Sequence, residues 1–277
     1  MSKHGALSLA TSEEAVDVDF SCFIKDAPIS VRAANPITEY FRATESLKAK
    51  IIHAAGSGDS ELFGLLTIGI ISAVEFYLRS VFSSVPLICP LARRHIEMAT
   101  VPIGAIDFYA LPGASHLAAC FDHESLADGE KIKKLCEKFT GLKIATDGSA
   151  AKTIDDFGTL CEIRHCLVHT RGNVGLKASN ALSLSSRVPS RVVITTDQAL
   201  TITKLSHNVT RAINRFVSDG IVSRWVDNGL LVGDWDADKV LFTPVVRFFE
   251  YSEESAQATN VYRRYLPFRK AALSRLA

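Results

Sequence analysis

The spacing of apolar residues along the chain predicts a protein built mainly from helices. The first clear segment begins at Pro36, and there Phe41, Leu47 and Ile51 recur at near-helical intervals. Gly56 follows this segment, and glycine is a common stop signal for helices. We therefore expect the first helix between these two points.

The next apolar segment predicts a long central helix. Asp59 can cap its start, and residues 62–85 are apolar nearly all round. This length approaches the roughly 20 residues that span a bilayer. Because Glu75 and Arg79 interrupt the apolar run, we expect a buried core helix that stops before Pro86, and no membrane span.

Six Pro and Gly residues then break up the chain between residues 86 and 113. We interpret residues 86–125 as an insertion or lid that holds one short helix, LARRHIEMA. Two amphipathic helices are expected next, the first ending at Gly141 and the second at Gly172. An extended stretch, VVIT, precedes a last long helix that begins near Asp197.

The pattern changes at both ends of the chain, and this suggests three regions. Residues 1–35 show no sustained period, so we expect a loosely ordered lead-in or a short strand. Residues 36–222 carry the helical patterns. Residues 223–277 contain GLLVGDW and KVLFTPVVRFFEY, which look more like strands. The predicted fold class is mainly α, a helical bundle with a small mixed α/β or strand-containing C-terminal extension.

Composition indicates a globular protein without a dominant charge. Hydrophobic residues make up 47% of the chain, and 31 Lys and Arg nearly balance 30 Asp and Glu. No global field therefore attracts nucleic acid, and any RNA contact must come from a local patch. The densest basic cluster comprises Lys131, Lys133, Lys134 and Lys138.

The cysteines and the N-terminus favour a cytoplasmic protein. The six cysteines form no CxxC pair, so we interpret them as thiols in a reducing compartment. The first 20 residues carry acids where a signal peptide would be apolar. Neither a cofactor fingerprint nor a hydrolase elbow is found in the sequence.

The candidate chemistry lies in one string, Glu-Ile-Arg-His-Cys-Leu-Val-His-Thr-Arg-Gly at 162–172. Arg164 can hold a phosphate through its guanidinium fork, while His165 and His169 can move protons near neutral pH. On an ideal helix Arg164 and His169 are about 140° apart. We expect His169 to lie in the last turn before Gly172, where its side chain can turn toward a groove and the helix dipole favours the imidazolium.

These residues resemble a known family. Arg164 followed by four residues and His169, with the polar His165 directly after the Arg, is similar to the Arg-x4–6-His signature of HEPN domains. The wording IRHCLVHTRGNV is close to the RHxIVHxxG form of the RiboL-PSP branch of that superfamily. The segment ISAVEFYLRSVF, which holds Glu75, resembles the first core helix of such domains.

The resemblance implies a bundle of four or more helices that pairs as a homodimer, with the Arg and His of both subunits lining one groove. Such domains cut RNA without metal or cofactor by attack of the ribose 2′-OH, which leaves 2′,3′-cyclic phosphate and 5′-OH ends. By the same analogy Arg164 holds the phosphate, His169 is the general acid or base, His165 assists, and Glu75 braces Arg164. Many members are toxins or antiphage defence effectors, and some have an antitoxin or regulatory protein partner.

Three other interpretations remain open at this point. The domain could be a catalytically inactive HEPN module that binds RNA or a partner protein. Arg164 and His169 could be ordinary helix-end residues that satisfy carbonyl groups. His165 and His169, at i and i+4, could bind zinc together with Glu162 or a cysteine, although the HExxH order is absent. Glu75 could also simply pair with Arg79 on its own helix.

Overall fold

A computed structural model describes residues 20–23, 35–104, 116–184, 189–251 and 260–276. The described part of the chain contains nine α-helices and two short 3-10 helices. They are η1 (Phe20–Phe23), α1 (Pro36–His53), α2 (Ser60–Ile88), α3 (Pro90–His95), η2 (His116–Phe121), α5 (Gly129–Thr140), α6 (Ser149–His169), α7 (Leu176–Ala181), α8 (Thr196–Asp227), α9 (Trp235–Phe249) and α10 (Val261–Leu276). The mainly helical class is confirmed.

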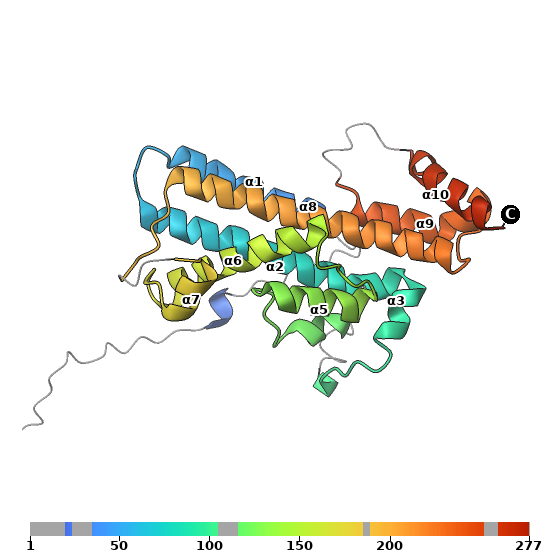
Figure 1. Ribbon diagram of the computed structural model, residues 1–277, viewed down its shortest axis with the longest axis horizontal. Helices are drawn as coiled ribbons and strands as arrows, with labels where there is room; N and C mark the ends of the chain where they lie inside the picture. The colour runs from blue at the N-terminus through green and yellow to red at the C-terminus, as the bar shows by residue number, and fades with distance from the viewer. Residues whose placement is uncertain (1–19, 24–34, 105–115, 185–188, 252–259, 277) are drawn as a thin grey trace, which may run out of the picture.

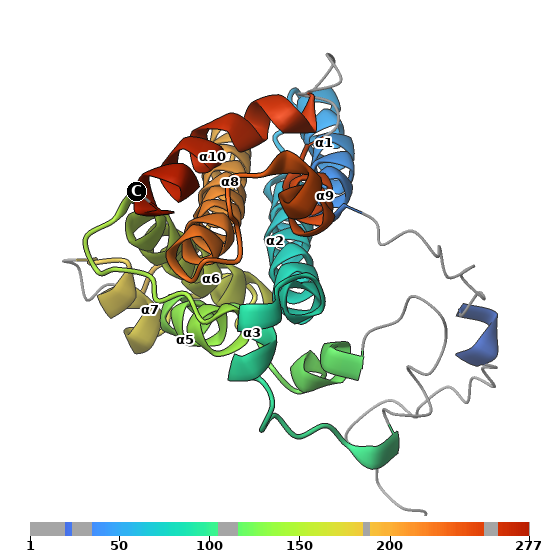
Figure 2. The same cartoon turned by 90° about the vertical axis from the view of Figure 1, so that its right-hand side faces the viewer.

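The long helices α1, α2, α6 and α8 pack side by side as a bundle (Figures 1 and 2). α2 contacts each of the other three and also supports α3, α5 and η2. Ile70 and Val74 of α2, Phe157 of α6, and Ile213 and Trp225 of α8 are completely or almost completely buried. Burial of these apolar side chains between the helices supplies most of the driving force for folding, and it fixes α6 against α2.

Local stop and start signals in the sequence predict most of the helix ends correctly. The Asp59 side chain accepts hydrogen bonds from the backbone N–H groups of Glu61 and Leu62 and so caps α2. A capping box between Thr195 and Gln198 begins α8. Gly141 ends α5 with a φ of 69°, in the left-handed conformation that glycine adopts most easily.

The prediction that the central helix stops before Pro86 is wrong. α2 continues through Pro86 to Ile88. Proline removes one N–H donor and disfavours a helical residue before it. The last turn still closes, because the N–H of Cys89 donates to the Val85 carbonyl at 2.9 Å. Arg93 from α3 also donates to the Pro86 carbonyl, so a side chain from outside α2 satisfies one of the carbonyl groups at the helix end.

The strand-containing C-terminal extension is also wrong, since both described elements after Asp227 are helices. In α9, Phe242, Val245, Val246 and Phe249 are buried at the i, i+3, i+4, i+7 spacing of a helix face. β-Branched and aromatic content favours strands only weakly, and packing of α9 on α8 and α1 decides the outcome. α8 also continues across the predicted boundary at residue 222.

The remaining predictions concern the lead-in, the lid and the membrane. Most of residues 1–35 lies outside the described residues, as does 105–115 of the lid. α3 overlaps the first part of the predicted segment LARRHIEMA, since it begins at Pro90 and ends at His95. By length and composition, α2 is the one described helix that could cross a membrane, but half of its most apolar window is buried in the bundle. The core helix of a globular protein can have the same length and apolar composition as a membrane-spanning helix.

Candidate functional site at the end of helix α6

Helix α6 ends where the sequence predicts, through a compact set of backbone hydrogen bonds. The Cys166 carbonyl accepts the N–H of Thr170 at 3.2 Å, the N–H of Gly172 at 2.8 Å and the Thr170 hydroxyl at 2.9 Å. Arg171 and Gly172 both have positive φ, at 51° and 88°. The chain therefore turns sharply after His169, and the last helical turn is held rigidly.

The two histidines of the motif lie together on the exposed side of α6. The ring centroids of His165 and His169 are 4.7 Å apart, and both side chains are exposed. Their separation by four residues explains this contact, because such residues lie one above the other on a helix. Two imidazoles at this distance can act as a proton donor and a proton acceptor on one substrate.

Arg164 lies on another face of α6 and is less exposed than the two histidines. Its side chain is half-buried, and its Nε atom is buried without a hydrogen-bond partner. The guanidinium forms no ion pair with any residue that the structure describes. A buried guanidinium N–H without an acceptor is costly, so Arg164 is suited to bind an anion. Because α6 remains helical through His169, these two residues stay on different faces of the helix.

Glu75 lies on α2 near Arg164 but does not brace it. Within the described ranges no ion pair joins Glu75 to Arg164 or to Arg79, and Arg79 instead donates to the carbonyls of Phe121 and Glu124. The three groups do share one region of the α2–α6 interface. The pKa of the Cys161 thiol is raised to about 12, mainly by burial and in smaller part by the Glu75 carboxylate, while Arg164 acts in the opposite direction.

A groove of about 650 Å³ adjoins the end of α6, between the start of α2 and the segment 191–193. Arg171 and Arg191 line it, together with apolar residues that include Leu65 and Val193. Sequence reasoning did not single out Arg191, which is 20 positions after Arg171. An isolated antiparallel bridge between Asn173 and Arg191 brings the two arginines together, and no local spacing could reveal it.

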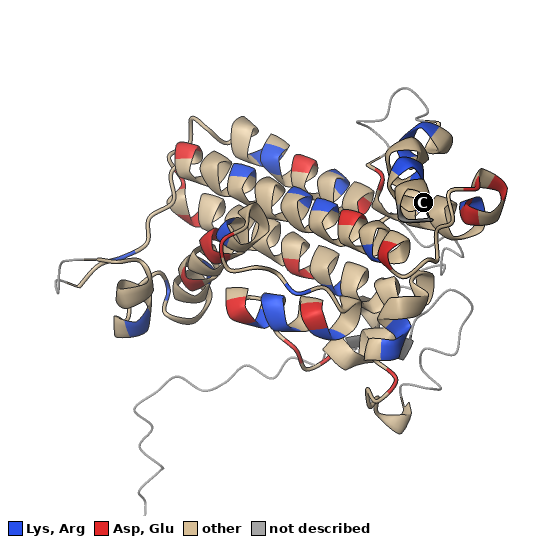
Figure 3. Cartoon of the chain, turned by 45° about the vertical axis from the view of Figure 1, so that its right-hand side comes forward, with Lys and Arg blue, Asp and Glu red and all other residues tan. Residues whose placement is uncertain are grey.

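Two of the four lysines in the predicted basic cluster on α5 are paired with carboxylates. The Lys131 ammonium pairs with Glu124, and the Lys133 ammonium lies 2.8 Å from Glu130 and 2.6 Å from Asp155. Figure 3 shows Lys and Arg interleaved with Asp and Glu along the helices. The α5 cluster is therefore a weak candidate for RNA contact.

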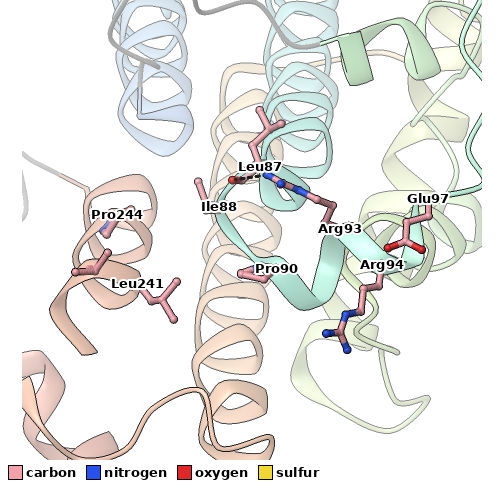
Figure 4. Close-up of a pocket in the computed structure, with 9 residues that line it drawn as sticks. Leu87, Ile88, Pro90, Arg93, Arg94, Glu97, Leu241 and Pro244 are labelled. Atoms are coloured by element: carbon pink, nitrogen blue, oxygen red, sulfur yellow. Dashed lines mark hydrogen bonds between the residues drawn. The ribbon is translucent and has the colours of Figure 1, made fainter. Parts of the chain in front are cut away.

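A second hollow, of about 470 Å³, lies between α3 and α9 (Figure 4). Leu87 and Leu241 contribute apolar walls. Arg93 is already bound there, because its guanidinium donates to the backbone carbonyls of Pro86 and Leu87. This hollow contains none of the motif residues.

The zinc alternative lacks a ligand set among the described residues, where no group of three or more His, Cys, Asp or Glu is arranged to hold a metal ion. Glu162, the acid nearest the histidines in sequence, pairs with Lys177 of α7 at 2.9 Å.

Comparison with known protein families, with curated proteins and with solved structures finds no match to this chain.

Proposed function

We propose that this protein is a metal-independent endoribonuclease with a HEPN-like helical bundle, and that the end of α6 is its active site. The observation that carries this proposal is the exposed His165–His169 pair beside Arg164, a guanidinium without a described partner. The Arg-x4-His spacing, which resembles the HEPN signature, supports the same conclusion. A role as a toxin or antiphage defence effector, held in check by an antitoxin or regulatory protein in the cytoplasm, is consistent with such an activity.

The chemistry needs only side chains that this site contains. One imidazole takes the proton of the ribose 2′-OH, whose oxygen then forms a bond to the adjacent phosphorus. The bond from phosphorus to the 5′-oxygen breaks, and the second imidazole, in its protonated form, donates a proton to that leaving oxygen. Arg164 stabilises the charge on the non-bridging oxygens. We assign the main proton-transfer role to His169 and the assisting role to His165.

The positions of Arg164 and His169 on different faces of α6 favour a site shared between two subunits. An Arg from one copy could then meet a His from the other in one groove. Exposed apolar residues are available for such pairing: Leu65 and Phe76 of α2 are 67% and 61% exposed and lie within about 20° of each other around the helix. We therefore propose a homodimer, and light scattering measures its mass.

The proposal is tested by incubating total RNA in EDTA with wild type and with Arg164→Gln, His165→Ala and His169→Ala. Loss of a general acid or base lowers the rate by about 10²- to 10⁴-fold, so His169→Ala should be nearly inactive. His53→Ala, an exposed histidine at the end of α1, is the matched control and should keep full activity. Equal activity in wild type and His169→Ala would overturn the assignment.

A second function, RNA or protein binding without cleavage, is favoured by the same separation of Arg164 and His169. In that case the arginine would hold phosphate, and no proton transfer would follow. The two functions differ in a simple mixing experiment. If the site is shared, Arg164→Gln and His169→Ala subunits should recover activity when combined, because a mixed dimer contains one intact pair of residues. A binding module remains inactive in every combination.

A further inference from the structure

We infer that the groove between the start of α2 and the segment 191–193 is a subsite for single-stranded RNA, in which Arg171 and Arg191 hold phosphates of the strand that is cut at α6. This inference rests on the proposed function. It identifies the local patch that a chain with a net charge of only +1 requires for binding a polyanion.

The charge of the groove is the first observation. Arg171 and Arg191 are both exposed, and neither forms an ion pair with a described residue. Glu61 is the one carboxylate among the lining residues, so cations outnumber anions two to one. On α5, in contrast, Lys131 and Lys133 are already paired with carboxylates. Charge complementarity therefore favours a phosphate backbone as the occupant of this groove.

The backbone geometry fixes both arginines in place. The N–H of Val192 donates to the Gly172 carbonyl at 2.8 Å, and the Asn173–Arg191 bridge lies beside it. A Cβ on Gly172 would come within 3.3 Å of the Arg191 Cγ, so the stem of Arg191 lies directly over this glycine. Arg171 has a φ of 51°, which a residue with a Cβ rarely adopts. A residue kept in such a conformation often has a functional role.

The groove also has the right position and lining for a strand that reaches the active site. Leu167 lies one turn after Arg164 on the same face of α6, and it lines the groove together with Arg171, which follows the end of the helix. The exposed wall residue Val193 offers apolar surface to an unstacked base. In single-stranded RNA the bases are free to contact the protein and the backbone is flexible. In an RNA duplex, by contrast, the deep and narrow major groove hides the base edges.

The test measures binding separately from cleavage. The probe is a short, fluorescently labelled 2′-O-methyl oligonucleotide, which keeps the phosphates but lacks the attacking hydroxyl. Wild type is compared by fluorescence anisotropy with Arg171→Gln/Arg191→Gln. The matched control is Arg263→Gln/Lys270→Gln, which makes the same charge change at exposed positions of α10, at the other end of the bundle (Figure 1). Arg171→Lys/Arg191→Lys keeps the charge.

We expect the groove variant to bind about 10- to 30-fold more weakly near 0.1 M salt, and its salt slope to fall by about 1.4, because two phosphate contacts are lost. The α10 control and the Lys variant should stay within about threefold of wild type. Arg171→Gly, which relieves the positive φ, should melt no lower than wild type and still bind more weakly. This variant separates lost binding from lost folding.

Three results would overturn the inference. The first is equal affinity of wild type and the groove variant. The second is tighter binding of a duplex than of the single strand. The third is an Arg-dependent affinity for an acidic peptide without affinity for the oligonucleotide. Failure of the proposed function looks different: the strand then binds through the two arginines, but unmodified RNA is not cut. If RNA is cut equally well by the groove variant at every concentration, the groove inference alone fails.

Discussion

The buried thiols Cys136 and Cys161 give the clearest prediction about stability, because both hold the α2–α5–α6 interface on which the site depends. Burial raises the pKa of each thiol from 9.0 to about 12. At about pH 8 the thiol is protonated in both the folded and the unfolded chain. Between pH 9 and 12 the unfolded thiol releases its proton while the folded one keeps it, so the free energy of unfolding falls as pH rises.

The size of this effect follows from the two pKa values. Between about pH 8 and pH 10.5 each thiol costs about 2 kcal/mol, so the pair costs about 4 kcal/mol. The assay is urea unfolding at both pH values, followed by circular dichroism under reducing conditions. The Cys136→Ala/Cys161→Ala variant is less stable at both pH values, because cavities form in the core. Its loss between the two pH values should nevertheless be smaller than that of wild type by about 4 kcal/mol.

Two results would refute this reasoning. One is an identical loss of stability with pH in wild type and variant, which would mean that the thiols ionise equally in the folded and unfolded states. The other is rapid alkylation of both thiols in the folded protein at neutral pH. Cys22 is exposed and provides an internal standard for the reaction rate.

Three further predictions concern the fold and the charge pattern. Gly141→Ala should lower stability by about 2 kcal/mol or more, since its φ is 69° and its Cβ would meet His95 at 2.3 Å. Gly56→Ala, with open space around it, should change little, and thermal unfolding compares the two variants. Tyr265→Phe should lower the free energy of unfolding by about 1–3 kcal/mol, because the buried Asp238 carboxylate loses the Tyr265 hydroxyl and keeps only two backbone donors. Urea unfolding measures this change, and an unchanged midpoint would contradict it. Lys131→Gln/Lys133→Gln should leave RNA affinity within about twofold of wild type, because both ammonium groups are already paired with carboxylates. A loss of RNA affinity as large as that of the groove variant would contradict this.

The sequence predicts what local chemistry determines. Gly141 and Gly172 end their helices as expected, because a left-handed residue is needed at the turn itself. The contact between His165 and His169 follows from their spacing of four residues. At Pro86 a local rule failed, since α2 continues for two more residues and its end packs against α3.

The parts that sequence did not predict depend on distant contacts. Helix α9 carries strand-favouring residues, and its helical form comes from burial against α8 and α1. Arg191 joins the site through a bridge to Asn173, which has no signature in the local pattern. The expected pairing of Glu75 with Arg164 requires a particular side-chain arrangement between two helices, and the described contacts do not include it.

The most direct test of the proposed activity uses one RNA strand with a known cleavage position, made once with ribose and once with 2′-deoxyribose at that position. Both strands are incubated with wild type in EDTA, and the product ends are identified by mass spectrometry. We predict a 2′,3′-cyclic phosphate and a 5′-OH from the ribose strand, with no cut at that position in the deoxy strand. Cleavage of the deoxy strand, or activity that disappears in EDTA, would contradict a metal-independent attack by the 2′-OH at the end of α6.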